Sequence, residues 1–218
     1  DDRGLSASDY DAPLLGGWLA DPVPGGGDPA RVAAFDVALS IAVTRYAANL
    51  YLGRINPRMV GFALDVEPKR LNLPQRVLEI SQSSRPEALV DALEPGFPVY
   101  RLLREALGRY RQLARVLPYV RFAFPAKFSP GMMHKDVPAL RRMLVALGDL
   151  DASRSGEADS QRYDSELAAA VKAFQHRHGL ADDGVIGKGT LARLSTPVAE
   201  RLKQIQLGME RLRWLPVD

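Results

Sequence analysis

The stretch that most constrains the fold is residues 137–194, whose apolar residues recur at the spacing of short α-helices. The first helix is predicted to begin after Asp136, a good N-cap, and to end at Gly148. A second helix is predicted from near Asp164 to Gly179, and a third, shorter one follows. Three such helices build a core from about 60 residues, which is marginal but feasible for an independent unit. We call residues 137–194 the module.

A glycine-rich turn is predicted to close the module. Gly184 and Gly187 bracket two apolar residues, and Asp183 beside a glycine is typical of a tight turn. Gly179 can take the left-handed conformation at the end of the second helix without steric cost. We therefore assign Gly179, Asp183, Gly184 and Gly187 a structural role. A cation site at Asp182 and Asp183 is the alternative, and turn capping is favoured over it.

In order and spacing, these residues resemble the type 1 peptidoglycan-binding domain. The matching pieces are Val137-x-x-Leu140-x-x-x-Leu144-x-x-Leu147-Gly148, Ala170-Val171-x-x-Phe174-Gln175, Gly179-Leu180, Asp183-Gly184-Val185-Ile186-Gly187 and Thr190-Leu191. The chain departs from the family at Arg141, where a glutamine is usual, and in a long loop over 149–162. The resemblance implies a small three-helix domain with peptidoglycan as its partner.

Four long polar side chains are the candidates for contact with that ligand. Gln175 follows Phe174, an expected core residue, and is predicted to point away from the core toward glycan or peptide. Arg141, Arg142 and Arg177 are candidates for the carboxylates of the stem peptides, because guanidinium groups pair strongly with carboxylates.

Other site chemistry finds little support in the sequence. The 218 residues contain no cysteine, which excludes a disulfide, a thiolate metal site and a cysteine nucleophile within them. His176 and His178 are two residues apart, so their rings leave a helix on different faces, and His134 is the one remaining histidine. No spacing singles out a catalytic pair of carboxylates. We therefore expect neither a metal nor a cofactor.

Charge is distributed unevenly along a chain whose net charge is only +3. Residues 1–30 hold six Asp and one Arg, whereas residues 101–121 hold six Arg and one Glu. The two stretches either attract each other within the fold or leave the basic one to an anionic partner. No nucleic-acid motif appears, so nucleic acid is not an expected partner.

No apolar run approaches 18 residues, so no transmembrane segment is expected. The start of the chain reads as a mature or trimmed one, without a signal peptide.

The rest of the chain is predicted to be helical, which makes the fold class all-α. Expected helices cover residues 29–52, 73–81, 86–93, 98–117 and 197–215. We expect a flexible segment at 1–29, with a link at Pro22, Pro24 and Gly25–Gly27, and a scaffold domain at 30–130. The binding domain should occupy 131–196, followed by a helix at 197–218.

Two stretches of the expected scaffold invite a functional interpretation. Arg101, Arg104, Arg111 and Arg115 share the polar face of the 98–117 helix. That face is either an anion-binding surface or an ordinary solvated face, and the second is favoured. Residues 118–131 contain an alternating apolar run around Phe122 and Phe124, the period of a strand. This run either pairs with something outside the chain or is an extended connector.

A wider resemblance joins these parts. The pieces are Arg45-Tyr46-Ala47-Ala48-Asn49-Leu50-Tyr51-Leu52-Gly53-Arg54-Ile55-Asn56-Pro57, Leu102-Leu103-Arg104-x-Ala106-Leu107-x-x-Tyr110-Arg111, the module, and Glu200-Arg201-x-x-Gln204-Ile205-x-x-x-Met209-Glu210-Arg211-x-Arg213-Trp214-Leu215-Pro216. Their order is similar to that in large periplasmic L,D-transpeptidases of Gram-negative bacteria, over roughly residues 35–216. In that family a YkuD-type β-domain follows, with a cysteine nucleophile in a His-Gly-Cys context.

The resemblance implies a non-catalytic, periplasmic region of a cell-wall transpeptidase, with the missing catalytic domain as its partner. The run around Phe122 and Phe124 would then lie against that domain. Two alternatives stay open: a non-enzymatic helical docking module, and a peptidoglycan hydrolase or an accessory domain of one.

Overall fold

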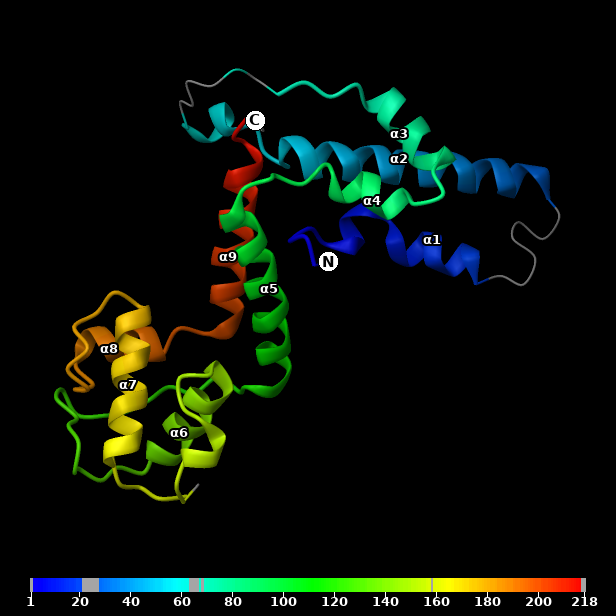
Figure 1. The fold of residues 1–218 in the computed structure, drawn as a ribbon. Helices are drawn as coiled ribbons and strands as arrows, with labels where there is room; N and C mark the ends of the chain where they lie inside the picture. The colour runs from blue at the N-terminus through cyan, green and yellow to red at the C-terminus, as the bar shows by residue number, and fades with distance from the viewer. Residues whose placement is uncertain (1, 21–27, 63–66, 68, 158, 217–218) are drawn as a thin grey trace. The chain divides into compact units, whose positions relative to one another are not determined.

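The computed structural model describes residues 2–20, 28–62, 67, 69–157 and 159–216. Over these ranges the fold is all-α, as expected, with isolated β-bridges and no strand. The helices are α1 Ala12–Leu19, α2 Pro29–Leu52, α3 Leu73–Gln82, α4 Pro86–Asp91, α5 Pro98–Val116, α6 Val137–Leu147, α7 Ser165–Arg177, α8 Lys188–Leu194 and α9 Val198–Arg213 (Figure 1). Short 3₁₀ turns lie at Ala7–Tyr10, Pro57–Val60 and Ala152–Arg154.

The chain divides into two compact units. Unit 1 comprises Asp1–Gly108 together with Lys203–Asp218, and unit 2 comprises Arg109–Leu202. This division differs from the expected boundaries near residues 130 and 196, because the second half of α5 and the segment after it belong with the module.

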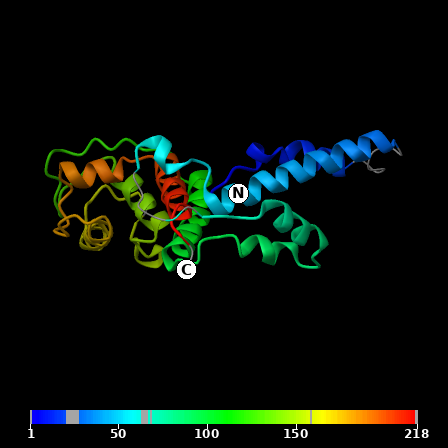
Figure 2. The same ribbon diagram turned by 90° about the horizontal axis from the view of Figure 1, so that it is seen from above.

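Unit 1 is built around the long helix α2, along which α1 lies in both views (Figure 1, Figure 2). The Asp28 side chain accepts a hydrogen bond from the Ala30 amide at 2.9 Å, which caps the start of α2 beside Pro29. The buried side chains around it are Leu5, Tyr10, Leu15, Ala42, Ala47, Leu50 and Leu93.

The N-terminal residues differ from the flexible segment expected there. Within residues 2–20, a 3₁₀ turn and α1 place Leu5, Tyr10 and Leu15 in the core of unit 1. Burial of these three side chains orders the segment despite its acidic, glycine-containing composition. The predicted link at Pro22, Pro24 and Gly25–Gly27 lies outside the described residues.

The acidic N-terminus and the basic helix α5 meet at Arg104. Its guanidinium contacts Asp2 at 2.9 Å and Glu94 at 3.0 Å, and Arg3 also reaches Glu94, at 2.6 Å. Attraction within the fold is therefore confirmed for this arginine. The apolar side chains of α5 within unit 1 are buried unevenly: Tyr100 and Leu107 are in the core, but Leu102 is 60% exposed.

Unit 2 has its own core, and the connector before α6 contributes to it. Phe122, Phe124, Phe128 and Tyr163 form a chain of stacked rings with successive centroid distances of 5.4, 4.7 and 5.2 Å. Phe128 also exchanges backbone hydrogen bonds with Ile186. The apolar face of this segment is covered within unit 2, as the extended-connector alternative expects. Contact of the run with a further domain stays a prediction.

The ends of the module helices follow the predicted signals, with one exception. The Asp164 carboxylate accepts from the Leu167 amide at 2.8 Å and caps α7, and Gly148 ends α6 with a φ of +81°. Asp136 stands at the N-cap position of α6, but its side chain makes no cap. It accepts instead from the Ala123 amide at 2.8 Å, which holds the connector in place.

Candidate functional site

Gln175 holds the glycine-rich turn from inside the module. Its side-chain amide donates to Asp183 Oδ1 at 3.1 Å, to the Val185 carbonyl at 3.0 Å and to Thr190 Oγ1 at 3.1 Å. Its carbonyl oxygen accepts from the Gly184 amide at 2.9 Å. Gln175 is only 1% exposed, so the prediction that it points away from the core is wrong. The buried amides and carbonyls of the turn require these partners, and a helical glutamine supplies both kinds.

The predicted turn residues occupy the conformations expected of them. Gly179 and Gly184 have φ values of +65° and +75°, and Gly187 precedes α8 as an extended N-cap residue. The Asp183 carboxylate accepts from the Val185 amide at 2.8 Å. That amide and Gln175 hold the pKa of Asp183 below its ordinary value. Asp183 is therefore a turn cap. Within the described ranges, no three His, Cys, Asp or Glu side chains form a group that could hold a metal.

Arg141 is buried in an internal network. It is 2% exposed and its guanidinium contacts Asp164 Oδ2 at 2.6 Å and the Ser155 carbonyl oxygen at 2.5 Å. Burial acts to raise the pKa of Asp164, but the Leu167 amide and Arg141 outweigh it and lower that pKa. Arg141 thus ties the loop after α6 to the start of α7.

Arg142 and Arg177 reach the surface of unit 2. The side chain of Arg142 is 63% exposed, and its guanidinium lies 3.8 Å from the Asp159 carboxylate. Arg177 pairs with Asp149 through contacts of 2.5 and 3.1 Å, and its guanidinium lies over the Phe174 ring. The four predicted ligand residues do not converge on one site: two are internal and two are accessible.

The two histidines at the end of α7, His176 in its last turn and His178 at its C-cap, have different surroundings. His176 is exposed, with Asp182 at 3.6 Å. The His178 ring stacks on Phe174 with centroids 4.0 Å apart, and its Nδ1 donates to the Phe174 carbonyl oxygen at 2.8 Å. Burial first, and then the nearby Arg177 and Arg201, lower the pKa of His178 despite that hydrogen bond.

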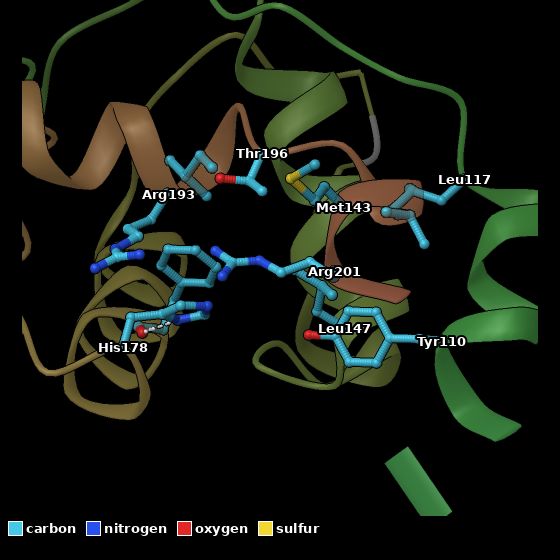
Figure 3. A pocket seen from close by; sticks show the side chains of 11 residues that line it. Tyr110, Leu117, Met143, Leu147, His178, Arg193, Thr196 and Arg201 are labelled. Carbon is cyan, nitrogen blue, oxygen red and sulfur yellow. Dashed lines mark hydrogen bonds between the residues drawn. The ribbon is translucent and has the colours of Figure 1, made fainter. Parts of the chain in front are cut away.

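A pocket that the sequence did not predict opens beside His178. Its cavity volume is about 20 Å³, and its polar lining residues are Tyr110, His178, Arg193, Thr196 and Arg201. The guanidinium ends of Arg193, from α8, and Arg201, from α9, lie on the same side of the pocket as the His178 ring (Figure 3). One sequence pattern could have indicated this pocket: two arginines eight residues apart flank the Ser195-Thr196-Pro197 turn.

Unit 1 contains a second polar network, centred on Glu210. Its Oε1 accepts from the Arg54 amide at 2.5 Å, the Ile55 amide at 3.1 Å and Trp214 Nε1 at 3.2 Å. Its Oε2 accepts from Arg213 at 3.2 Å, and Arg213 in turn donates to the Tyr100 hydroxyl at 2.9 Å. The network joins the loop after α2 to the end of α9.

Comparison with known families assigns both regions. Residues 133–194 match the family model described as Putative peptidoglycan binding domain, and residues 1–107 match the model described as Scaffold domain. No curated protein matches the chain significantly. The chain therefore contains a peptidoglycan-binding domain and a scaffold domain, which are binding and structural types. Across the part of the chain that is described, no helix combines the length and apolarity of a membrane span.

Proposed function

We propose that this chain is the peptidoglycan-binding and scaffold region of a periplasmic cell-wall L,D-transpeptidase. In this proposal unit 2 grips peptidoglycan, unit 1 forms the frame, and a YkuD-type domain of the same parent carries out acyl transfer. The peptidoglycan-binding match over residues 133–194 supports the first part. Arg142 and Arg177 are proposed as accessible contacts for the ligand, while Arg141 and Gln175 shape the domain that presents them.

One contact joins the first and last pieces of the wider resemblance. Glu210, in the last of the four pieces, accepts hydrogen bonds from the backbone amides of Arg54 and Ile55 in the first, although Glu210 and Arg54 are 156 residues apart in sequence. The two backbone amides need a hydrogen-bond acceptor in this partly buried position, and the Glu210 carboxylate supplies it. The transpeptidase parent is proposed from the wider resemblance, and two of its four pieces are in contact in the folded chain.

Co-sedimentation with purified sacculi tests the binding proposal. The 218-residue chain should be retained at low salt, while an equal mass of cellulose serves as a polysaccharide control. Retention on neither polymer would contradict peptidoglycan binding and favour a docking module. Release of soluble muropeptides during the incubation would instead indicate a hydrolase.

The gene sequence beyond Asp218 tests the transpeptidase parent. We expect it to continue into β-strands with a His-Gly-Cys stretch, because a thiolate nucleophile is what the acyl transfer requires. A stop codon directly after Asp218, or a different catalytic domain, would rule out this parent and leave the binding proposal intact.

A further inference from the structure

The pocket beside His178 continues into a larger apolar groove. The groove has a cavity volume of about 220 Å³ and shares Leu117, Met143, Leu194, Thr196 and Val198 with the pocket. The pocket itself, at about 20 Å³, has room for one water-sized group, since a single water occupies roughly 10–15 Å³ by this measure. The combination fits a ligand with one small polar end group and a short apolar body.

The polar end of this site is cationic. Two arginines and a histidine are among the eleven lining residues of the pocket, and none of the eleven is an aspartate or glutamate. The side chain of Arg193 makes no ion pair with any described residue. The neighbouring Arg177, by contrast, already has Asp149 as its partner.

Crowding of the arginine charges favours a bound anion. Burial lowers the pKa of Arg201; Tyr110 opposes this, and the charges of Arg193 and Arg177 lower the pKa further. An anion between Arg193 and Arg201 would offset that repulsion and could accept hydrogen bonds from both guanidinium groups. A neutral sugar hydroxyl offers no such compensation.

We infer that Arg193 and Arg201 bind a carboxylate of a peptidoglycan stem peptide, whose small apolar side chains lie in the adjoining groove. This inference rests on the proposed peptidoglycan binding and names the part of the polymer that is held. Guanidinium–carboxylate pairing supplies the specificity, and the groove, lined by Leu117, Val120 and Pro197 among others, excludes water from the methyl groups. Thr196, common to both cavities, marks the point where the carboxylate meets the apolar part.

Titration of the ¹⁵N-labelled chain with a synthetic tetrapeptide, L-Ala-γ-D-Glu-meso-diaminopimelate-D-Ala, tests this assignment by NMR. We expect the Thr196 amide and the Arg193 Nε resonances to shift on binding. Arg193→Gln and Arg201→Gln should each weaken binding about tenfold or more, the cost of a lost charge-assisted hydrogen bond. Lys188→Gln is the matched control: it removes an exposed positive charge from the same helix, outside the pocket, and should leave binding unchanged.

Two further ligands distinguish recognition of the peptide carboxylate from general attraction of anions. The same peptide with all carboxylates amidated should bind at least tenfold more weakly, and inorganic phosphate should not displace the free peptide at equal concentration. Equal binding of the amidated peptide, displacement by phosphate, or wild-type affinity in both arginine variants would each overturn the inference. A chain that is retained on sacculi but shows no shift with the peptide would overturn this site alone, whereas loss of both would overturn the proposed function.

Since Arg193 is exposed, Arg193→Gln should fold normally, which its amide spectrum verifies.

Discussion

Arg141 and Arg142 are adjacent in α6, yet the guanidinium of Arg141 is buried 2.6 Å from Asp164 whereas that of Arg142 faces solvent. Arg141→Met keeps the apolar stem but leaves Asp164 and the Ser155 carbonyl without their donor. We expect it to lower the free energy of unfolding of unit 2 by about 2–3 kcal/mol. Arg142→Met, its matched control, should change that free energy by less than about 0.5 kcal/mol. Urea unfolding followed by amide exchange in α6 and α7 compares the two, and equal losses would contradict the internal role of Arg141.

Gln175 should be the most sensitive polar side chain of the module. Gln175→Glu keeps its size but replaces the amide donor that serves Asp183, Val185 and Thr190 with a carboxylate. A buried charge facing the Asp183 carboxylate and the Val185 carbonyl oxygen, neither of which can donate a hydrogen bond, is strongly unfavourable. We therefore expect a loss of about 3 kcal/mol or more in unfolding free energy. His176→Ala, one residue further along α7 and exposed, is the control and should be nearly neutral. Amide exchange of the 182–187 turn reports the effect directly, and protection equal to that of the native chain would refute it.

The sequence was sufficient for most helices of the fold, but could not reveal which side of a helix each polar residue of the module faces. Gly148, Asp164 and Gly179 mark helix ends through contacts with residues close in sequence. The structure places each at the helix end that was predicted for it. The prediction for Gln175 is wrong because it considered only the neighbouring core residue Phe174. The acceptors that draw Gln175 inward belong to residues 183–190, later in the chain. Burial of polar side chains depends on partners distant in sequence, which periodicity does not record.

The same reason explains the connector and the new pocket. Alternation at Phe122 and Phe124 correctly indicated extended backbone, but the surface that covers it comes from residues 137–194, Tyr163 among them. Arg193 and Arg201 belong to separate helices, and each alone is an ordinary basic residue. Their common site exists because the turn between α8 and α9 brings both beside His178.

Gly53 is predicted to be the least replaceable of the described glycines of unit 1. Its φ and ψ of +87° and 164° suit glycine alone, and an added Cβ would lie 2.8 Å from both Glu210 and Trp214. Gly53→Ala should therefore cost about 3 kcal/mol or more in unfolding free energy. Gly61→Ala is the control, since its φ is +79° but nothing lies within 4 Å of the new Cβ, so about 1 kcal/mol of strain is expected. Thermal unfolding of both variants measures the difference, and equal shifts would show that the close approach to Trp214 is unimportant.

Glu210 is expected to stabilise unit 1 through its charge as well as its hydrogen bonds. Glu210→Gln retains one acceptor for Arg54 and Ile55 but leaves the fully buried Arg213 without its carboxylate. Removing one member of a buried ion pair costs about 3–5 kcal/mol. Glu105→Gln, an exposed position on α5, controls for the loss of a negative charge. Amide exchange at Arg54 and Ile55 should rise in the first variant alone, and unchanged exchange would contradict the role of Glu210.

His178 should make the stability of unit 2 depend on pH in the mildly acidic range. Burial lowers its pKa in the folded chain below the ordinary value of 6.5, so between those two values the unfolded chain binds more protons. Stability contributed by the neutral ring is therefore complete above pH 6.5 and is lost as the pH falls toward the folded pKa. His178→Gln should flatten this part of the stability profile, whereas His176→Gln, at an exposed position beside Asp182, should retain it. Unfolding of both variants followed at α7 between pH 5 and 7.5 separates these outcomes, and an unchanged slope in His178→Gln would show that the ring stacked on Phe174 stays free to protonate.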